Sequence, residues 1–119
     1  MARATCLLVE PATTSRSLRP ILQGNAACFE VLEVHSLGEA SRSLQHIDEL
    51  NSAVIDDRVA GADDIATLLR HSFPDTLIIM VSDQATRSFD EATAVVPHNF
   101  PQALAVALRR ESAKRRQTT

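Results

Sequence analysis

Three apolar runs in this sequence each end in a side chain that can do chemistry. These side chains are Glu10, Asp56 and Ser82, two carboxylic acids and a hydroxyl. Short apolar runs are typical of buried parallel strands, and α/β folds place their sites at the carboxyl edge of such a sheet. We therefore expect the three side chains to share one oxygen-rich site.

Apolar runs alternate with segments of helical spacing along the whole chain. We expect strands near residues 5–9, 29–34, 52–55, 76–81 and 92–96. Helical spacing runs from a cap at 13–15 to Gln23, from Ser36 to Ile47, across 65–69 up to Pro74, and from Pro101 onward. This alternation predicts a parallel sheet with right-handed crossovers and helices on both faces.

The composition fits a single globular domain over residues 1–119. Hydrophobic residues make up 45% of the chain, and the absence of Trp and Tyr predicts an aliphatic core. No apolar run approaches the roughly 20 residues of a membrane span, and the N-terminus lacks a signal-peptide pattern, so we expect a stand-alone cytoplasmic protein. Cys6 and Cys28 lack metal-binding spacing and are expected to be free thiols.

Charge is distributed unevenly along the chain, whose net charge is −3. Residues 109–119 hold five basic residues and one acidic residue, whereas the rest holds seven basic and fourteen acidic residues. The basic end is interpreted as the solvated, frayed last turns of a helix over 111–119, where cations favour the helix dipole. Contact with an acidic partner is the alternative. Nucleic-acid binding is not expected, because the body is acidic and no helix-turn-helix region follows it.

The order of these elements resembles the response-regulator receiver domain, a flavodoxin-like (βα)5 fold with a doubly wound parallel five-stranded sheet. The likeness covers about residues 4–110. Asp56 falls at the position of the family's phosphoacceptor aspartate, and Ser82 falls at the Ser or Thr that closes the fourth strand. The run His98–Phe100 falls where the family normally reads Lys-Pro-Phe.

The resemblance implies phosphoryl transfer from a histidine kinase to Asp56 at a Mg²⁺ site. Glu10 fills the first of the family's two acidic ligand positions, but Pro11 stands at the second and offers no side-chain ligand. The backbone carbonyl of Arg58 is the remaining implied ligand. Asp57 is not expected to replace the missing acid, because adjacent strand residues point to opposite faces. We therefore expect Mg²⁺ binding to be weak or absent.

Other parts of the family's switch are also replaced. His98 is shorter than the family lysine and largely neutral near pH 7 unless a carboxylate favours its charged form; a solvent-facing loop residue is the other interpretation. Val95 stands where many receivers carry a switch Tyr or Phe, and a stiff valine cannot make that movement. The connection from Ser82 to His98 is short, so we expect a shortened or irregular fourth helix.

Three functions are compatible with these residues. We favour an atypical receiver that is not an enzyme and acts through protein–protein interaction, with weak or absent phosphorylation, because each lost component weakens charge stabilisation during phosphoryl transfer. Its partner would be a sensor kinase, a phosphotransfer protein or a downstream signalling protein. The second is a functional phosphoacceptor at Asp56. The third is a flavodoxin-like nucleotide or small-molecule binder, since residues 11–16 form a hydroxyl-rich loop.

Overall fold

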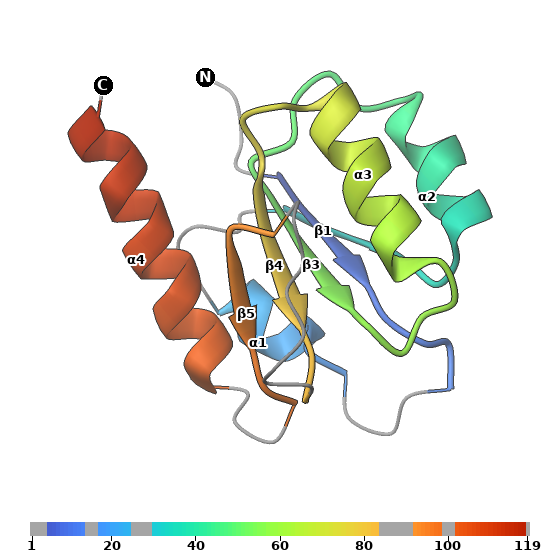
Figure 1. Ribbon diagram of the computed structural model, residues 1–119, viewed down its shortest axis with the longest axis horizontal. Helices are drawn as coiled ribbons and strands as arrows, with labels where there is room; N and C mark the ends of the chain where they lie inside the picture. Colours follow the sequence, from blue (N-terminus) through green and yellow to red (C-terminus); the bar gives the residue numbers. More distant parts are fainter. Residues whose placement is uncertain (1–4, 14–16, 25–29, 84–91, 99–101, 119) are drawn as a thin grey trace.

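Five parallel strands form one sheet in the order β2-β1-β3-β4-β5, as Figure 1 shows. The computed structural model describes residues 5–13, 17–24, 30–83, 92–98 and 102–118. The strands are β1 (Thr5–Val9), β2 (Glu30–Val34), β3 (Ser52–Asp56), β4 (Leu77–Val81) and β5 (Ala94–Val96). The predicted doubly wound parallel sheet is confirmed.

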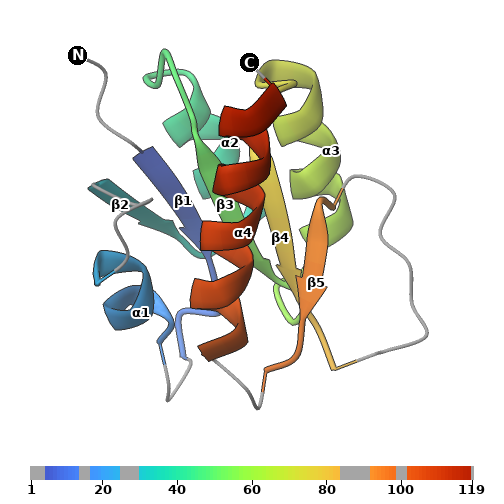
Figure 2. The ribbon, with the colours of Figure 1, turned by 90° about the vertical axis from the view of Figure 1, so that its left-hand side faces the viewer.

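Helices cover both faces of this sheet (Figures 1 and 2). They are α1 (Arg19–Gln23), α2 (Leu37–Leu44), α3 (Ala62–Ser72) and α4 (Gln102–Thr118). Buried side chains of α2 and α3 pack in one core cluster, and those of α1 and α4 pack in a second cluster on the opposite face. None of the described helices has the length and apolar character needed to cross a membrane.

The two core clusters follow from the alternation of side chains along each strand. On β1, Leu7 and Val9 belong to the first cluster, whereas Cys6 and Leu8 belong to the second. All five residues of β4 are buried, as expected for a strand covered on both faces. The buried hydrophobic side chains of the described residues are aliphatic or contain sulfur, which agrees with the sequence-based expectation.

Helix starts differ in how well the sequence predicts them. The Ser36 hydroxyl accepts a hydrogen bond from the Glu39 backbone N–H at 3.1 Å, so the expected cap of α2 is confirmed. The predicted start of α1 at 13–15 is wrong, because the helix begins at Arg19. Pro20 lies in its first turn, where the missing backbone N–H costs no hydrogen bond.

Two further segments bear on the sequence-based expectations. The helix α3 follows Gly61, whose φ of 81° is a left-handed conformation that glycine adopts without strain. The helix α4 continues to Thr118, through the stretch expected to fray. The expected shortening of a helix between β4 and β5 concerns residues 84–91, which lie outside the described residues.

Candidate functional site

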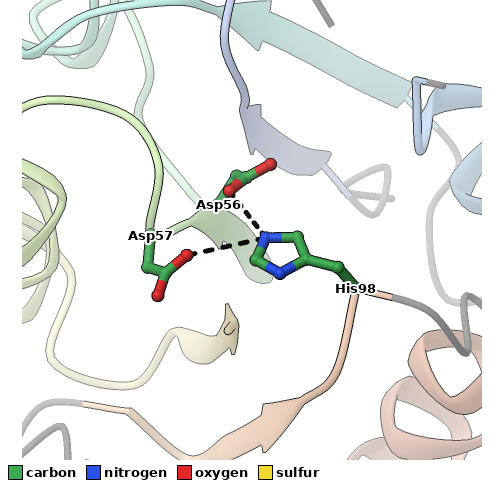
Figure 3. Close-up of side chains that lie close together, drawn as sticks. All are labelled: Asp56, Asp57 and His98. Carbon is green, nitrogen blue, oxygen red and sulfur yellow. Dashed lines mark hydrogen bonds and ion pairs between the residues drawn. The ribbon is translucent and has the colours of Figure 1, made fainter. Parts of the chain in front are cut away.

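The carboxyl edge of the sheet brings several polar side chains together. Asp56 ends β3 and pairs in register with Val81, the last residue of β4, which pairs in turn with Val96. Ser82, the residue after Val81, therefore lies near Asp56. His98 lies two residues beyond the end of β5. Figure 3 shows the His98 ring, on the segment that follows β5, pointing toward Asp56 and Asp57.

Asp56 is the most heavily hydrogen-bonded side chain of the edge, and it is only 2% exposed. Its Oδ1 accepts from the Arg58 backbone N–H at 2.9 Å and from Arg58 Nε at 3.1 Å, and it lies 2.8 Å from His98 Nε2. Its Oδ2 accepts from Arg58 Nη2 at 2.7 Å and from Nε at 3.2 Å. An ionised carboxylate only accepts, so His98 Nε2 carries a proton in this contact.

These contacts decide the protonation of Asp56. Burial raises the pKa of its carboxyl, but hydrogen bonds from the Arg58 side chain and backbone and from His98 outweigh burial and hold that pKa below its ordinary value. The same hydrogen bond to Asp56 raises the pKa of the Arg58 guanidinium. The carboxylate is therefore ionised and already has a cation of its own.

The Arg58 side chain is the feature that the sequence did not reveal. The family resemblance gave Arg58 only a backbone carbonyl role, yet its guanidinium covers Asp56 while remaining 56% exposed to solvent. Asp56 accepts from the backbone N–H two residues further on, which is the pattern of an Asx-turn. A strand-ending Asp followed at that spacing by Arg is the sequence signal that predicts this pair.

Asp57 lies in the same site, so the expectation that it points away is wrong. Strand alternation does not govern it, because β3 ends at Asp56 and Asp57 belongs to the following turn. Its Oδ2 accepts from the Ser82 hydroxyl at 2.6 Å, and its Oδ1 lies 3.5 Å from His98 Nε2. Ser82 thus contacts the carboxylate next to the expected acceptor.

His98 is enclosed by carboxylates, and its side chain is only 16% exposed. The interpretation of His98 as a solvent-facing loop residue is therefore wrong. Its backbone N–H donates to Asp83 Oδ1 at 2.9 Å, and its Nδ1 lies 3.1 Å from Asp83 Oδ2. That second approach lacks hydrogen-bond geometry, and the buried Nδ1 has no hydrogen-bond partner among the residues that the structure describes.

Glu10 has a different set of partners. One of its carboxylate oxygens accepts from the Ser17 hydroxyl, and the other accepts from the Leu18 backbone N–H at 3.1 Å. Leu18 is the N-cap residue of α1 and makes no cap with its own side chain. The buried Glu10 thereby holds the start of α1 against the end of β1.

Donor atoms of Asp56, Asp57 and His98 all lie within 4.8 Å of one another, and Glu10 is not in this group. The group does not fit the Mg²⁺ ion that the receiver resemblance implies. Magnesium prefers octahedral coordination by oxygen atoms, whereas one of these donors is an imidazole nitrogen and both Asp56 oxygens accept from Arg58.

Comparisons with known proteins bear on the fold. A CheY-like response regulator receiver domain protein from Methanospirillum hungatei JF-1 superimposes with a TM-score of 0.77 over 99% of this chain and 100% of that chain, at 17% sequence identity. The chain has the receiver fold. A putative pilus assembly-related protein from Burkholderia pseudomallei K96243 shares it, with a TM-score of 0.61 over 91% and 89% of the two chains at 21% identity.

The receiver fold is not accompanied by a match at the level of sequence. No protein-family model and no curated protein matches this chain. Likeness at these identities establishes the architecture alone. The roles of the residues at the receiver edge therefore rest on their own contacts.

Proposed function

We propose that this chain is an atypical receiver-like signalling module of the cytoplasm that acts by binding a protein partner, independently of phosphorylation at Asp56. It is not an enzyme in this proposal. The observation that carries it is the engagement of both Asp56 carboxylate oxygens by Arg58 and His98. An acceptor in that state has no free oxygen lone pair aimed at a phosphoryl donor.

Electrostatics of the edge supports the same conclusion. Phosphoryl transfer depends on cations that neutralise charge developing on the phosphoryl oxygens. Here the Arg58 guanidinium pairs with Asp56 itself, and the Pro11 side chain offers no ligand for a metal ion. A phosphoryl donor would instead meet the carboxylates of Asp57 and Asp83, both within 3.5 Å of the His98 ring.

A partner surface is proposed on β5 and α4. Val95 and Val106 are the large hydrophobic side chains most exposed in the described part of the chain, at 43% and 51%. Ala94 and Val96 pack in the same core cluster as α4, so Val95 faces the other side of the sheet, and a partner would have to cover the β5 edge to bury both valines.

The proposal is tested with a phosphate mimic. Amide spectra of the chain are recorded with Mg²⁺ and with Mg²⁺ plus beryllofluoride. We expect no change at Asp56 or Ser82 beyond that seen in Asp56→Asn. A variant carrying Pro11→Asp, Arg58→Ala and His98→Lys, which restores the family pattern, serves as the responsive control. Tight, Mg²⁺-dependent binding to the unaltered chain that is lost in Asp56→Asn would instead support the phosphoacceptor function.

The partner surface is tested separately. Val106→Glu is expected to leave the fold unchanged, because the side chain is half exposed, and to abolish binding to a partner identified for the chain. Thr67→Glu on the opposite face is the matched control and should bind normally. Equal binding by both variants would reject this location for the partner surface.

A further inference from the structure

We propose that two copies of this chain associate through their amino edges, the edge of each sheet at which β3 and β4 begin. In this dimer the basic end of α4 of one copy lies against an acidic pocket of the other copy. The amino edge is opposite to the edge that holds Asp56, and the contact does not use Val95 or Val106. The dimer is therefore independent of the proposed function.

A pocket of about 340 Å³ lies at this amino edge. Its wall is formed by the segment that leads into β3 and by the turn between α3 and β4. Three exposed carboxylates line it, those of Asp48, Glu49 and Asp75, and the half-buried Phe73 adds apolar surface. Binding pockets typically have about 300–1,000 Å³ and combine apolar surface with a few polar or charged groups. This pocket suits a cationic side chain with an apolar stem.

The fold does not neutralise these carboxylates. Among the described side chains, no cation forms an ion pair with any of the three. Arg70 reaches the same turn, but its Nη1 donates to the backbone carbonyls of Pro74 and Thr76 at 2.6 and 3.0 Å. The Thr76 hydroxyl donates to the Leu50 carbonyl at 2.7 Å. These hydrogen bonds hold the turn in place and leave its carboxylates for a cation from outside the chain.

The end of α4 has the opposite charge. Residues 109–114 hold three basic residues and one acidic residue, a net charge of +2. Arg109, Arg110 and Lys114 are exposed, and Glu111 pairs with Arg110 and Lys114 at 4.0 and 3.4 Å. Figures 1 and 2 show this end of α4 at the same edge of the molecule at which β3 and β4 begin. The basic helix end and the acidic pocket therefore belong to one edge.

This placement allows a closed contact between two copies. A rotation of 180° exchanges the copies, so the helix end of each meets the pocket of the other, as in a twofold dimer. A stable interface buries about 1,200–2,000 Å² in total, and the second, symmetry-related contact doubles the area that one pocket supplies. The rest of the chain carries seven basic and fourteen acidic residues, so the end of α4 is the part that a second copy attracts.

The test is sedimentation velocity of the untagged chain over a range of concentrations. We expect a monomer–dimer equilibrium at low salt that shifts to monomer at about 1 M salt, where the screening length falls to about 3 Å. Lys114→Glu and Asp75→Lys should each raise the dissociation constant about tenfold or more, because each places like charges together. An equimolar mixture of the two variants should dimerise again, since both contacts then join opposite charges.

Asp64→Lys is the matched control, because it makes the same change of charge as Asp75→Lys at an exposed position of the opposite edge. It should dimerise as the unaltered chain does, and fluorescently labelled Lys114→Glu should stay monomeric when mixed with it. Circular dichroism shows that each variant is folded.

Three results would overturn the dimer. They are a monomer at every concentration at low salt, a dimer that Lys114→Glu or Asp75→Lys leaves intact, and a mixture of these two variants that stays monomeric. None of them changes the beryllofluoride result. Asp56-dependent beryllofluoride binding would in turn remove the proposed function and leave the dimer in place.

Discussion

The Arg58 guanidinium lies against the Asp56 carboxylate, with Nη2 2.7 Å from Oδ2 and Nε 3.1 Å from Oδ1. The two residues are only two positions apart, so the turn that follows β3 brings a cation onto the buried acid that ends it. The resemblance to receiver domains predicts the phosphoacceptor at this acid. Here the positive charge beside the acid comes from the chain itself.

Removing that cation should raise the pKa of the Asp56 carboxyl. Arg58→Ala removes the side-chain hydrogen bond that most strongly opposes the effect of burial, while the backbone N–H of residue 58 and His98 still lower that pKa. Loss of hydrogen bonds to a buried charged group should also cost about 1–3 kcal/mol of unfolding free energy at neutral pH. Carboxyl carbon NMR and urea unfolding measure the two effects. Arg109→Ala, an exposed position on α4, should change neither.

Acid should weaken the fold through the same carboxylate. The pKa of Asp56 is lowered from an ordinary value of 3.8, so the folded state binds its proton more weakly than the unfolded state does. Its stabilising effect is complete above the unfolded pKa and is lost as the pH falls through the folded pKa. Urea unfolding from about pH 7 to about pH 3 should show a steeper loss for the unaltered chain than for Asp56→Asn. An equal loss of unfolding free energy with falling pH in both proteins would contradict a stabilising role of the Asp56–Arg58 pair.

The Ser82 hydroxyl should stabilise the site through Asp57. Ser82→Ala removes the donor of a 2.6 Å hydrogen bond to Asp57 Oδ2 and should cost about 1–3 kcal/mol. A double-mutant cycle with Asp57→Ala isolates the pairwise energy, which we expect to be about 0.5–3 kcal/mol. A coupling energy near zero would mean that this contact does not stabilise the folded chain.

Glu10 should behave as an anchor of α1. Glu10→Ala removes the acceptor for the Leu18 backbone N–H and the Ser17 hydroxyl, and it should cost about 1–3 kcal/mol because both donors lose a charged partner. Amide exchange of residues 18–24 should accelerate selectively. Glu10→Gln, which retains one acceptor oxygen, should show a smaller effect. If the exchange of α1 did not change while Mg²⁺ affinity fell, Glu10 would instead be a metal ligand.

The fold could be predicted from the sequence because the spacing of the apolar residues distinguishes strands from helices. The run Leu77–Val81 is apolar throughout, and it is the strand β4, buried on both faces. The start of α2 could be predicted from Ser36, because a side-chain cap involves residues only three positions apart. The start of α1 was missed because the side chain that holds it, Glu10, lies at the end of β1 and not at the helix's own first turn.

The site could be predicted only in part. Several of its side chains lie in turns after the strands, where the alternation of strand residues no longer sets their direction. Asp56 was found as the end of an apolar run. Asp57 was excluded by strand alternation, which stops applying one residue earlier. The role of His98 depended on carboxylates from two separate segments, Asp56 with Asp57 and Asp83, a convergence that only the folded sheet edge produces.

The most direct measurement of the central claim is the intact mass of the chain after incubation with a small-molecule phosphodonor and Mg²⁺. Because Arg58 and His98 occupy the Asp56 carboxylate, we predict no gain of a phosphoryl group. The variant carrying Pro11→Asp, Arg58→Ala and His98→Lys serves as the positive control. Addition of one phosphoryl group to the unaltered chain, absent from Asp56→Asn, would contradict the account.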